Sequence, residues 1–158
     1  MEWHPIDRDE VADLLDADEE RLIDWLEDPI RRPFDVDKAW HGLHAVLTGS
    51  ADECDHPLSS VVFGGEEFGA DLGYGPSRYL TADEVRQLAA ALDELEPADF
   101  RAQVDLAALD DLDTYPDAWD ADDETDDNVR WLLDAFETVR SGFHRAADHG
   151  QAMVITAV

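Results

Sequence analysis

Apolar residues recur at helical spacing along much of the chain. The pattern is clearest over residues 35–47, where four apolar side chains fall at i, i+4, i+7 and i+11: Val36, Trp40, Leu43 and Leu47. Asp35 can cap the start of this helix, and Gly49 can stop its end. The segment is therefore predicted as a helix with one buried face.

Further helices are predicted where the same spacing follows a capping signal. Thr81 with Glu84 has the form of a capping box, and an apolar stripe runs behind it to residue 95. A long stripe over residues 129–146 ends at Gly150. Residues 7–26 are predicted as two short helices, or as one helix that bends near Asp18. A further helix is predicted to start at Pro97 and to continue to Leu109.

Two stretches are typical of buried strands. Ser59–Phe63 combines β-branched and aromatic residues before two glycines, and residues 152–158 form the second stretch. Because two strands alone would be unstable, we expect partner strands from Trp3–Ile6 and from around Arg78–Leu80. The elements predict an α/β fold, a single helix-rich domain with a small mixed sheet packed by helices as a layered sandwich.

Five of the nine glycines lie between residues 64 and 75. This density disfavours a regular helix or strand, so the segment is predicted as a loop. It matches neither glycine-rich string that holds phosphate, and the carboxylates of Glu66, Glu67 and Asp71 would repel such a group. A rigid loop packed by its own apolar side chains is the structural alternative.

Length and composition favour one folded domain over residues 1–158. Of the 158 residues, 38 are Leu, Ile, Val or Phe, a share above the roughly 20% below which chains tend to stay disordered. Within the domain, residues 105–127 contain eleven acids and no base. They are predicted as an exposed acidic connection anchored by Tyr115 and Trp119.

The chain carries 40 acidic and 11 basic residues, a formal net charge of -29. Affinity for nucleic acid or for an anionic membrane comes from lysines and arginines that neutralise phosphate, so neither is expected as a partner. Lys38 is the only lysine. A salt-rich cytoplasm and a GC-rich genome would each produce this bias.

Cys54 is the only cysteine, so no disulfide can form within the chain, which fits a reducing compartment. The start of the chain has no basic segment followed by an apolar run, and no stretch approaches 18 apolar residues. A cytoplasmic location is therefore expected.

Several strings of residues occur together in a distinctive order: Asp-Val-Asp-Lys-Ala-Trp-His-Gly-Leu-His from Asp35 to His44, Leu-Thr-Gly at 47–49, Gly-Tyr-Gly-Pro-Ser-Arg-Tyr-Leu at 73–80, Tyr-Pro-x-x-Trp at 115–119, and Phe-x-x-Ala-Ala-x-x-Gly at 143–150. From about residue 7 onward the chain resembles the YfbM-like family, a bacterial domain of unknown function. The resemblance implies a single-domain α/β sandwich with no established activity, cofactor or partner. The acid excess and the acidic segment near Asp120 depart from the family pattern.

Asp37, His41 and His44 stand at i, i+4 and i+7 of the predicted 35–47 helix and so share one stripe beside its apolar face. Two imidazoles and a carboxylate could form part of a metal site, although further ligands would have to come from elsewhere. Alternatively, the histidines lie at the border of the core and hydrogen-bond carbonyl groups of an adjacent loop. No metal or cofactor is assigned.

The acidic run from Asp120 to Asp126 has carboxylates on alternate positions. An EF-hand loop is excluded because Thr125 replaces the glycine at its sixth place and Trp131 replaces the acid at its twelfth. The run is predicted as a solvated stretch that binds cations weakly at most.

We expect a non-catalytic module that binds an unidentified protein or small molecule. Its predicted site lies where the 40–44 helix meets the 64–79 segment. The site comprises eight residues: Asp37, Trp40, His41, His44, Glu66, Glu67, Tyr74 and Arg78. One role of this kind is that of an antitoxin-like immunity protein, which covers a basic toxin or nuclease by charge complementarity.

The alternative is a small-molecule enzyme. His41 or His44 would act as its base and a glutamate of the 66–67 pair as the partner, while Arg78 would stabilise charge. A concave pocket that holds these side chains together would favour the enzyme. Histidines tied to the backbone would favour the binding module.

The net charge predicts that salt stabilises the fold. Raising NaCl from 0.1 to 1 M shortens the Debye length from about 10 Å to about 3 Å, so repulsion among the acids is screened. We expect the melting temperature to rise by several degrees across this range, measured by circular dichroism. A flat or falling melting temperature would contradict this account of the charge.

Overall fold

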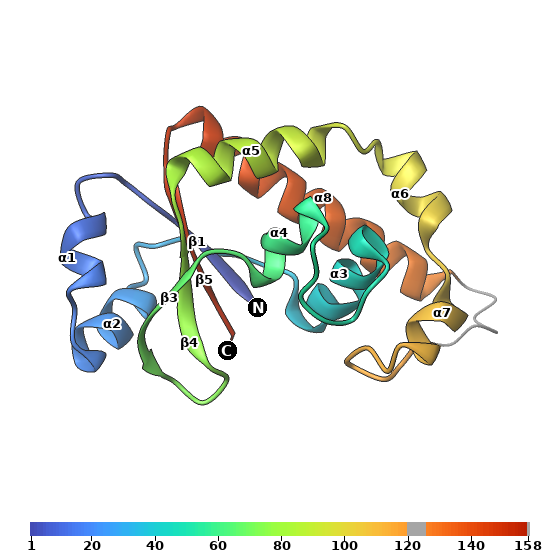
Figure 1. Ribbon diagram of the computed structural model, residues 1–158, viewed down its shortest axis with the longest axis horizontal. Helices are drawn as coiled ribbons and strands as arrows, with labels where there is room; N and C mark the ends of the chain where they lie inside the picture. The colour runs from blue at the N-terminus through green and yellow to red at the C-terminus, as the bar shows by residue number, and fades with distance from the viewer. Residues whose placement is uncertain (120–125, 158) are drawn as a thin grey trace.

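A computed structural model describes residues 1–119 and 126–157 and shows helices on both faces of a five-stranded sheet (Figure 1). The strands are β1 (Glu2–Ile6), β2 (Phe34–Asp35), β3 (Glu66–Asp71), β4 (Pro76–Leu80) and β5 (Ala152–Thr156). The helices are α1 (Val11–Leu15), α2 (Glu19–Leu26), α3 (Trp40–Thr48), α4 (Ser60–Phe63), α5 (Ala82–Asp93), α6 (Pro97–Gln103), α7 (Leu106–Asp111) and α8 (Asp127–Asp148), with 3-10 turns η1 (Asp37–Ala39) and η2 (Pro57–Ser59). No helix within the described ranges is long and apolar enough to cross a membrane.

The first and last of these strands pair at the centre of the sheet. The strand order is β2-β1-β5-β4-β3, and β1 pairs with β5 along its whole length, from Glu2 opposite Thr156 to Ile6 opposite Ala152. The predicted α/β class is confirmed, as are the partner strands expected near residues 3–6 and 78–80. The sheet is not mixed, however. Each neighbouring pair of described strands is antiparallel. In particular, β5 runs opposite to both of its neighbours, β1 and β4.

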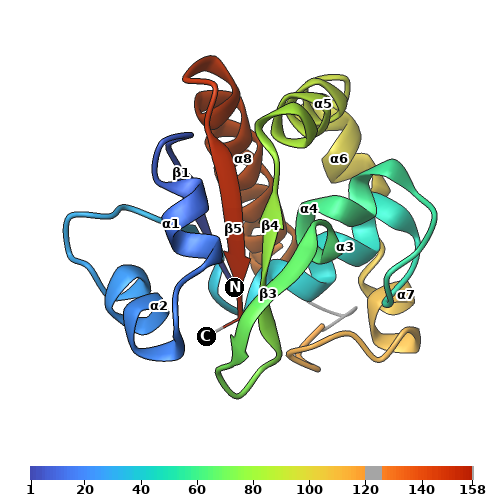
Figure 2. The same ribbon diagram turned by 60° about the vertical axis from the view of Figure 1, so that its left-hand side comes forward.

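Side chains alternate across the sheet between two cores. Trp3 and Ile155 belong to the larger core, which is covered by α3, α5 and α8. Ile6 and Val154 belong to the smaller core, which lies beneath α1 and α2. Successive residues of a strand point to opposite faces, so a single strand supplies both cores. Figure 2 shows α1 and α2 on one side of the sheet, apart from the other helices.

Trp3 fastens β1 into the larger core. Its buried indole N–H donates to the Val61 carbonyl over 2.8 Å, and its ring stacks on Phe34 with centroids 5.5 Å apart. The helix α8 approaches this stack at Gly142, where a Cβ atom would lie 2.5 Å from the Phe34 ring. Gly142 therefore sets how closely the long helix packs against the edge of the sheet.

The helices with clear caps are confirmed. Thr81 and Glu84 form the predicted capping box at the start of α5, and Gly49 ends α3 in the left-handed conformation with φ 74°. Gly150, after α8, is also left-handed. The helix predicted over 35–47 is shorter than expected, because α3 begins only at Trp40, after η1.

The prediction of a strand over residues 59–63 is wrong, since η2 and α4 occupy this stretch. Pro57 stands in the first turn, and the His56 side chain accepts from the Leu58 N–H, so the segment begins with helix-start chemistry. Val61 and Val62 are both buried because this turn lies inside the larger core. A run this short has no periodicity that separates a buried helical turn from a strand.

The prediction of a continuous loop over residues 64–75 is also wrong, because β3 forms within it. The strand β3 lies at the edge of the sheet, where a glycine is better tolerated than in a central strand. Gly69 has φ 72° and lies where the register with β4 shifts. The glycines therefore permit a bulged edge strand.

The acidic connection predicted over residues 105–127 contains the short helix α7. Trp119 is buried, and its indole N–H donates to the Thr114 carbonyl over 3.0 Å, so this anchor is confirmed. Tyr115 is exposed. Residues 120–125, and with them most of the predicted weak cation site, lie outside the described part of the chain.

His4 is a buried polar residue in the smaller core. It is 1% exposed, its ring lies 5.6 Å from that of Trp25, and its Nε2 is 3.1 Å from a carboxylate oxygen of Glu2. Burial, and then the charge of Arg31, lower the pKa of His4 to about 4. His4 is therefore neutral in the folded protein at pH 7.

Gly142→Ala is expected to destabilise the protein by about 1–2 kcal/mol. The gain in helix propensity of about 1 kcal/mol is outweighed by forcing the Phe34 ring off its stack, since overpacking costs about 1–3 kcal/mol. Urea unfolding would measure this change. Ser141→Ala, one residue away on the exposed side of α8, is the control, with an expected change below about 0.5 kcal/mol. A stabilised Gly142→Ala variant would refute the close-packing argument.

The lowered pKa of His4 makes stability depend on acid. The unfolded histidine takes up a proton near pH 6.5 and the folded one only near pH 4, so stability is lost as the pH falls through this window. The wild type should lose about 3 kcal/mol more than His4→Gln between pH 6.5 and pH 4. Urea unfolding at several pH values would measure the difference. Parallel curves for the two proteins would show that His4 does not titrate in this way.

Candidate functional site

The Trp-His-Gly-Leu-His string packs α3 against the segment that carries Trp119. At Gly42, a Cβ atom would lie 2.4 Å from the Trp119 ring and 3.1 Å from Leu132. Only the absence of a side chain lets the helix backbone meet the indole at this distance. Two of the family's strings, which are far apart in sequence, therefore form one contact, and the glycine serves this packing.

His41 joins three segments through both of its ring nitrogens. Nε2 donates to the Ala51 carbonyl over 2.9 Å, and Nδ1 accepts the backbone N–H of Tyr115, also over 2.9 Å. The ring stacks on Trp40 with centroids 4.8 Å apart. Because both nitrogens are used, His41 has no lone pair left for a metal ion or for a substrate proton.

His44 is fully buried and makes a similar contact. Its Nε2 donates to the Asp52 carbonyl over 3.0 Å, and the ring meets Phe63 edge-on with centroids 4.7 Å apart. Burial lowers the pKa of His44, although the hydrogen bond to Asp52 opposes part of this effect. The remaining nitrogen, Nδ1, is buried without a partner. His44 is therefore a neutral residue beneath the 50–52 loop.

Asp37 does not share a helical stripe with the two histidines. It lies in η1 with φ 50°, before α3 begins, so the predicted i, i+4, i+7 geometry fails. Across residues 1–119 and 126–157, no group of three or more His, Cys, Asp or Glu is arranged to hold a metal ion. The structure thus favours hydrogen bonds to an adjacent loop over the metal set.

Arg78 is held from two sides. One terminal nitrogen donates to the Phe63 carbonyl over 2.6 Å, and the other to the Glu67 carboxylate over 2.9 Å, with Glu53 a further ion-pair partner at 3.9 Å. Glu67 stands directly opposite Arg78 in the β3–β4 ladder. These bonds tie α4 to the edge of the sheet and fix the guanidinium in one position.

Beside Arg78 lies a groove with a volume of about 350 Å³. We call it the Trp40 groove. Its aromatic and polar walls come from α3, α4 and the β3–β4 hairpin: Trp40, Phe63, Glu67, Tyr74 and Arg78. Met1 and Ile155 also line it. Of the eight predicted site residues, the structure therefore brings four to one hollow.

The other four predicted residues are not in the groove. Asp37, His41 and His44 take the positions described above, and none of them lines it. Glu66 pairs with Tyr79, one step along β3 from Glu67, so it points to the opposite face of the sheet. The sequence prediction missed Phe63, because a strand over 59–63 would have placed its side chain differently.

The tip of the β3–β4 hairpin, which carries Tyr74, is fixed by one aspartate. A single oxygen of Asp71 accepts the backbone N–H groups of Gly73 and Gly75, each over 2.8 Å. These two hydrogen bonds lower the pKa of Asp71. Tyr74 stands between the two glycines and is 76% exposed, so the turn holds a large aromatic side chain out from the surface.

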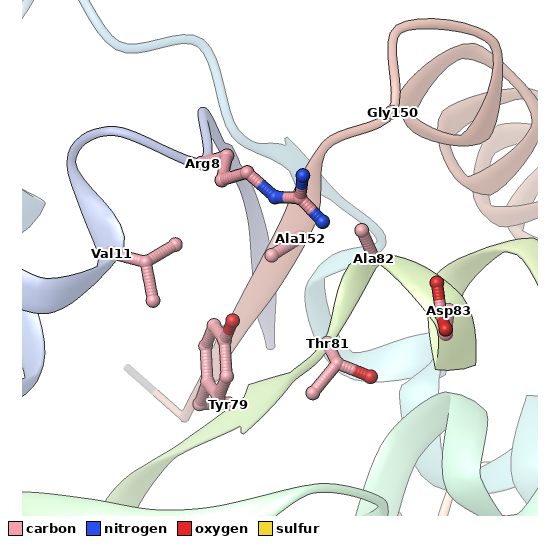
Figure 3. A pocket seen from close by; sticks show the side chains of 8 residues that line it. All are labelled: Arg8, Val11, Tyr79, Thr81, Ala82, Asp83, Gly150 and Ala152. Atoms are coloured by element: carbon pink, nitrogen blue, oxygen red, sulfur yellow. The ribbon is translucent and has the colours of Figure 1, made fainter.

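A separate hollow of about 340 Å³ lies at the start of α5 (Figure 3). Arg8 reaches it from the segment after β1, and Tyr79 reaches it from β4. Burial, and then the charge of Glu84, raise the pKa of Tyr79. Asp83 at its edge is already paired with Arg86 over 2.7 Å. The residues that line this hollow include no buried polar side chain on which a ligand site could rest.

Comparison with known proteins agrees with this architecture. A family model described as "Domain of unknown function (DUF1877)" matches residues 1–156. Protein YfbM of Escherichia coli (strain K12) is 32% identical over 119 residues, which cover 70% of this chain and 69% of YfbM. The crystal structure of YfbM from Escherichia coli, a protein of unknown function, matches with a TM-score of 0.75 at 22% identity, over 99% of this chain and 98% of that one. The chain therefore belongs to the DUF1877 family, and the resemblance inferred from its motifs is confirmed.

Proposed function

We propose that the protein is a non-catalytic binding module that holds a large apolar side chain of a basic partner protein in the Trp40 groove. The observation that carries this proposal is the exposed Tyr74, which is held by the Asp71 turn at the rim of a hollow with an aromatic wall. A volume of about 350 Å³ falls at the lower end of the range for ligand sites, roughly 300–1,000 Å³, and leaves room for one anchoring side chain.

The surface around the groove is rich in aromatic side chains. Tyr115 is 45% exposed, and its ring lies 6.5 Å from that of Trp40, which in turn meets Phe63 at 6.1 Å. Trp, Tyr and Arg are the residues that most often dominate binding energy at protein interfaces. Here all three types occur around one hollow, which favours recognition of another protein.

Two parts of the groove wall are held in place by hydrogen bonds within the protein. Arg78 is tied to Phe63 and Glu67, and the Tyr74 turn is tied to Asp71. Side chains that are already fixed lose little conformational entropy on association, so more of the contact energy remains as affinity.

Charge supports a basic partner. Glu53 and Glu67 lie beside Arg78, and the chain as a whole carries -29. Negative charge on this scale accelerates encounter with a basic surface and repels acidic proteins. An antitoxin-like immunity role, in which the module covers a basic toxin or nuclease, is one function of this kind.

The catalytic alternative lacks its base. Both ring nitrogens of His41 are occupied, and the His44 ring is buried beneath the 50–52 loop. Neither residue lines the Trp40 groove. Arg78, the residue expected to stabilise charge in an enzyme, is already neutralised by Glu67. The geometry therefore favours binding without turnover.

Selection of displayed peptides would test the proposal. A random peptide library is enriched on the wild type alone, and the affinity of the selected peptides for the wild type and for Tyr74→Ala is measured by calorimetry. We expect selected peptides with one large apolar residue flanked by Lys and Arg, and binding at least about tenfold weaker to Tyr74→Ala. Tyr74 is so exposed that its truncation should leave the melting temperature unchanged.

Ile30→Ala is the matched control, because Ile30 is another exposed large apolar residue that does not line the groove. It should bind the selected peptides as the wild type does. Peptides that bind wild type and Tyr74→Ala equally would show that the groove is not the site. A selected set with acidic flanks would show that the partner is not basic.

A further inference from the structure

The turn that joins α2 to β2 presents the most exposed large hydrophobic side chain of the described residues. Ile30 is 84% exposed, compared with 76% for Tyr74 and 45% or less for the three others of this kind. A single exposed hydrophobic residue is common on protein surfaces. What sets Ile30 apart is how the turn holds it and which residues follow it.

Hydrogen bonds and prolines hold the backbone of this turn. The Asp28 carboxylate accepts the Ile30 N–H over 2.9 Å, and the Asp28 carbonyl accepts the Arg31 N–H over 3.0 Å. Pro29 and Pro33 restrict φ near the two ends of the turn. The turn therefore holds Ile30 out from the surface, as the Asp71 turn holds Tyr74.

Two arginines follow Ile30, at the only place in the sequence where two lysines or arginines are adjacent. Arg31 is already neutralised, because it pairs with Glu10 over 2.7 Å and lies 3.9 Å from the Trp25 ring centroid. Arg32 is exposed and forms no ion pair with residues 1–119 and 126–157. The turn thus combines a large apolar side chain with an unpaired cation two residues later.

The Trp40 groove has the complementary features. Besides its aromatic wall it is lined by Pro76 and Ile155, so an aliphatic side chain would meet apolar surface. Next to it, Glu53 and Glu67 are 65% and 55% exposed. Glu53 approaches Arg78 only to 3.9 Å, which leaves its carboxylate accessible to a second cation.

The turn and the groove of one molecule lie at opposite ends of the β1–β5 pair. Met1 and Ala157 line the groove at one end, whereas the hollow that Ile30 borders is lined by Asp7 and Gln151 at the other. The five residues of β1 span about 17 Å. Figure 2 shows the segment after α2 on the side of the sheet away from α3. An Ile30 side chain that fills a Trp40 groove must therefore come from another molecule.

We infer that the Trp40 groove of one copy receives the Ile30 side chain of a second copy, with Arg32 of that copy beside Glu53 and Glu67. The inference rests on the proposed function and adds a second copy of the chain as a partner of the groove. The contact is complementary in charge only locally, since each copy carries -29 and the two repel each other at long range.

Salt separates these opposing effects. Screening removes the long-range repulsion between two acidic chains, whereas burial of the Ile30 side chain does not depend on it. Self-association is therefore expected to strengthen as salt is raised. Binding of a basic partner protein is expected to weaken, because there the long-range force is attractive.

Sedimentation velocity of the full chain tests the inference at 0.1 and 1 M NaCl, where the Debye length is about 10 Å and about 3 Å. Because a contact through one side chain is weak, the protein is examined at concentrations up to about 1 mM. We expect the weight-average mass to rise with protein concentration, and to rise more steeply at 1 M NaCl.

Three variants identify the contact. Ile30→Ala and Tyr74→Ala should each weaken self-association at least about tenfold. Arg32→Glu places an acid beside Glu53 and should weaken it about threefold. Leu15→Ala is the matched control, because Leu15 is an exposed large apolar residue outside the turn and the groove. It should associate as the wild type does.

A mixture of two variants gives the sharpest test. Ile30→Ala keeps an intact groove and Tyr74→Ala keeps an intact turn, so each mixed pair contains one complete contact. At 1 M NaCl the mixture should form dimers with about the wild-type affinity, at concentrations at which neither variant associates alone.

Five results would each overturn the inference: a wild type that stays monomeric, self-association that falls as salt is raised, wild-type association by Ile30→Ala or Tyr74→Ala, an equal loss in Leu15→Ala, or a mixture that stays monomeric. Failure of the groove itself is measured separately. Peptides from the selection described above are titrated into dilute, monomeric Ile30→Ala, and they bind there if the groove is a site, whether or not the chain associates with itself.

Discussion

The pairing of β1 with β5 is the contact on which both cores depend. β1 places Trp3 on one face, where its indole is bonded to Val61 and stacked on Phe34, and it places His4 and Ile6 on the other face. β5 runs beside it in full register and contributes Ile155 and Val154 to the two faces. Ile155 of β5 lines the Trp40 groove, so this backbone ladder also supports the candidate site.

The predictable parts of the fold were those with local chemistry of their own. The capping box at Thr81 and the left-handed glycine at residue 49 form hydrogen bonds only to groups a few residues away. The local sequence therefore suffices to predict these two helix ends. The strand prediction for residues 59–63 failed because a single helical turn with two adjacent buried residues, Val61 and Val62, shows no helical periodicity. The loop prediction for residues 64–75 failed because the glycines there permit a bulge in β3, and this bulge exists only when β3 pairs with β4.

The candidate site was predictable to a similar degree. Arg78, Glu67, Tyr74 and Trp40 come together because the helix meets the 64–79 segment as expected, although this segment is a hairpin and not the predicted loop. His41 and His44 do not line the groove, because they hydrogen-bond carbonyl groups of an adjacent loop, as the structural alternative predicted. The sequence does not single out His4, because a lone histidine in a strand looks like any other until its surroundings are known. In the fold, its ring is buried and one ring nitrogen has no hydrogen-bond partner. The most recognisable sequence motifs serve packing of the fold, as the close contact between Gly42 and the Trp119 ring shows.

The position of β5 has a consequence for how the protein is made. The middle strand β5 follows β1 and β4 in the chain, so each of these two strands has an open edge until residues 152–156 have been synthesised. Helices such as α5 can form early, but the sheet closes only after translation of β5. Exposed strand edges invite pairing with other nascent chains, and a chain of charge -29 resists such association by mutual repulsion. Repulsion among the acids therefore works against such pairing until β5 is in place.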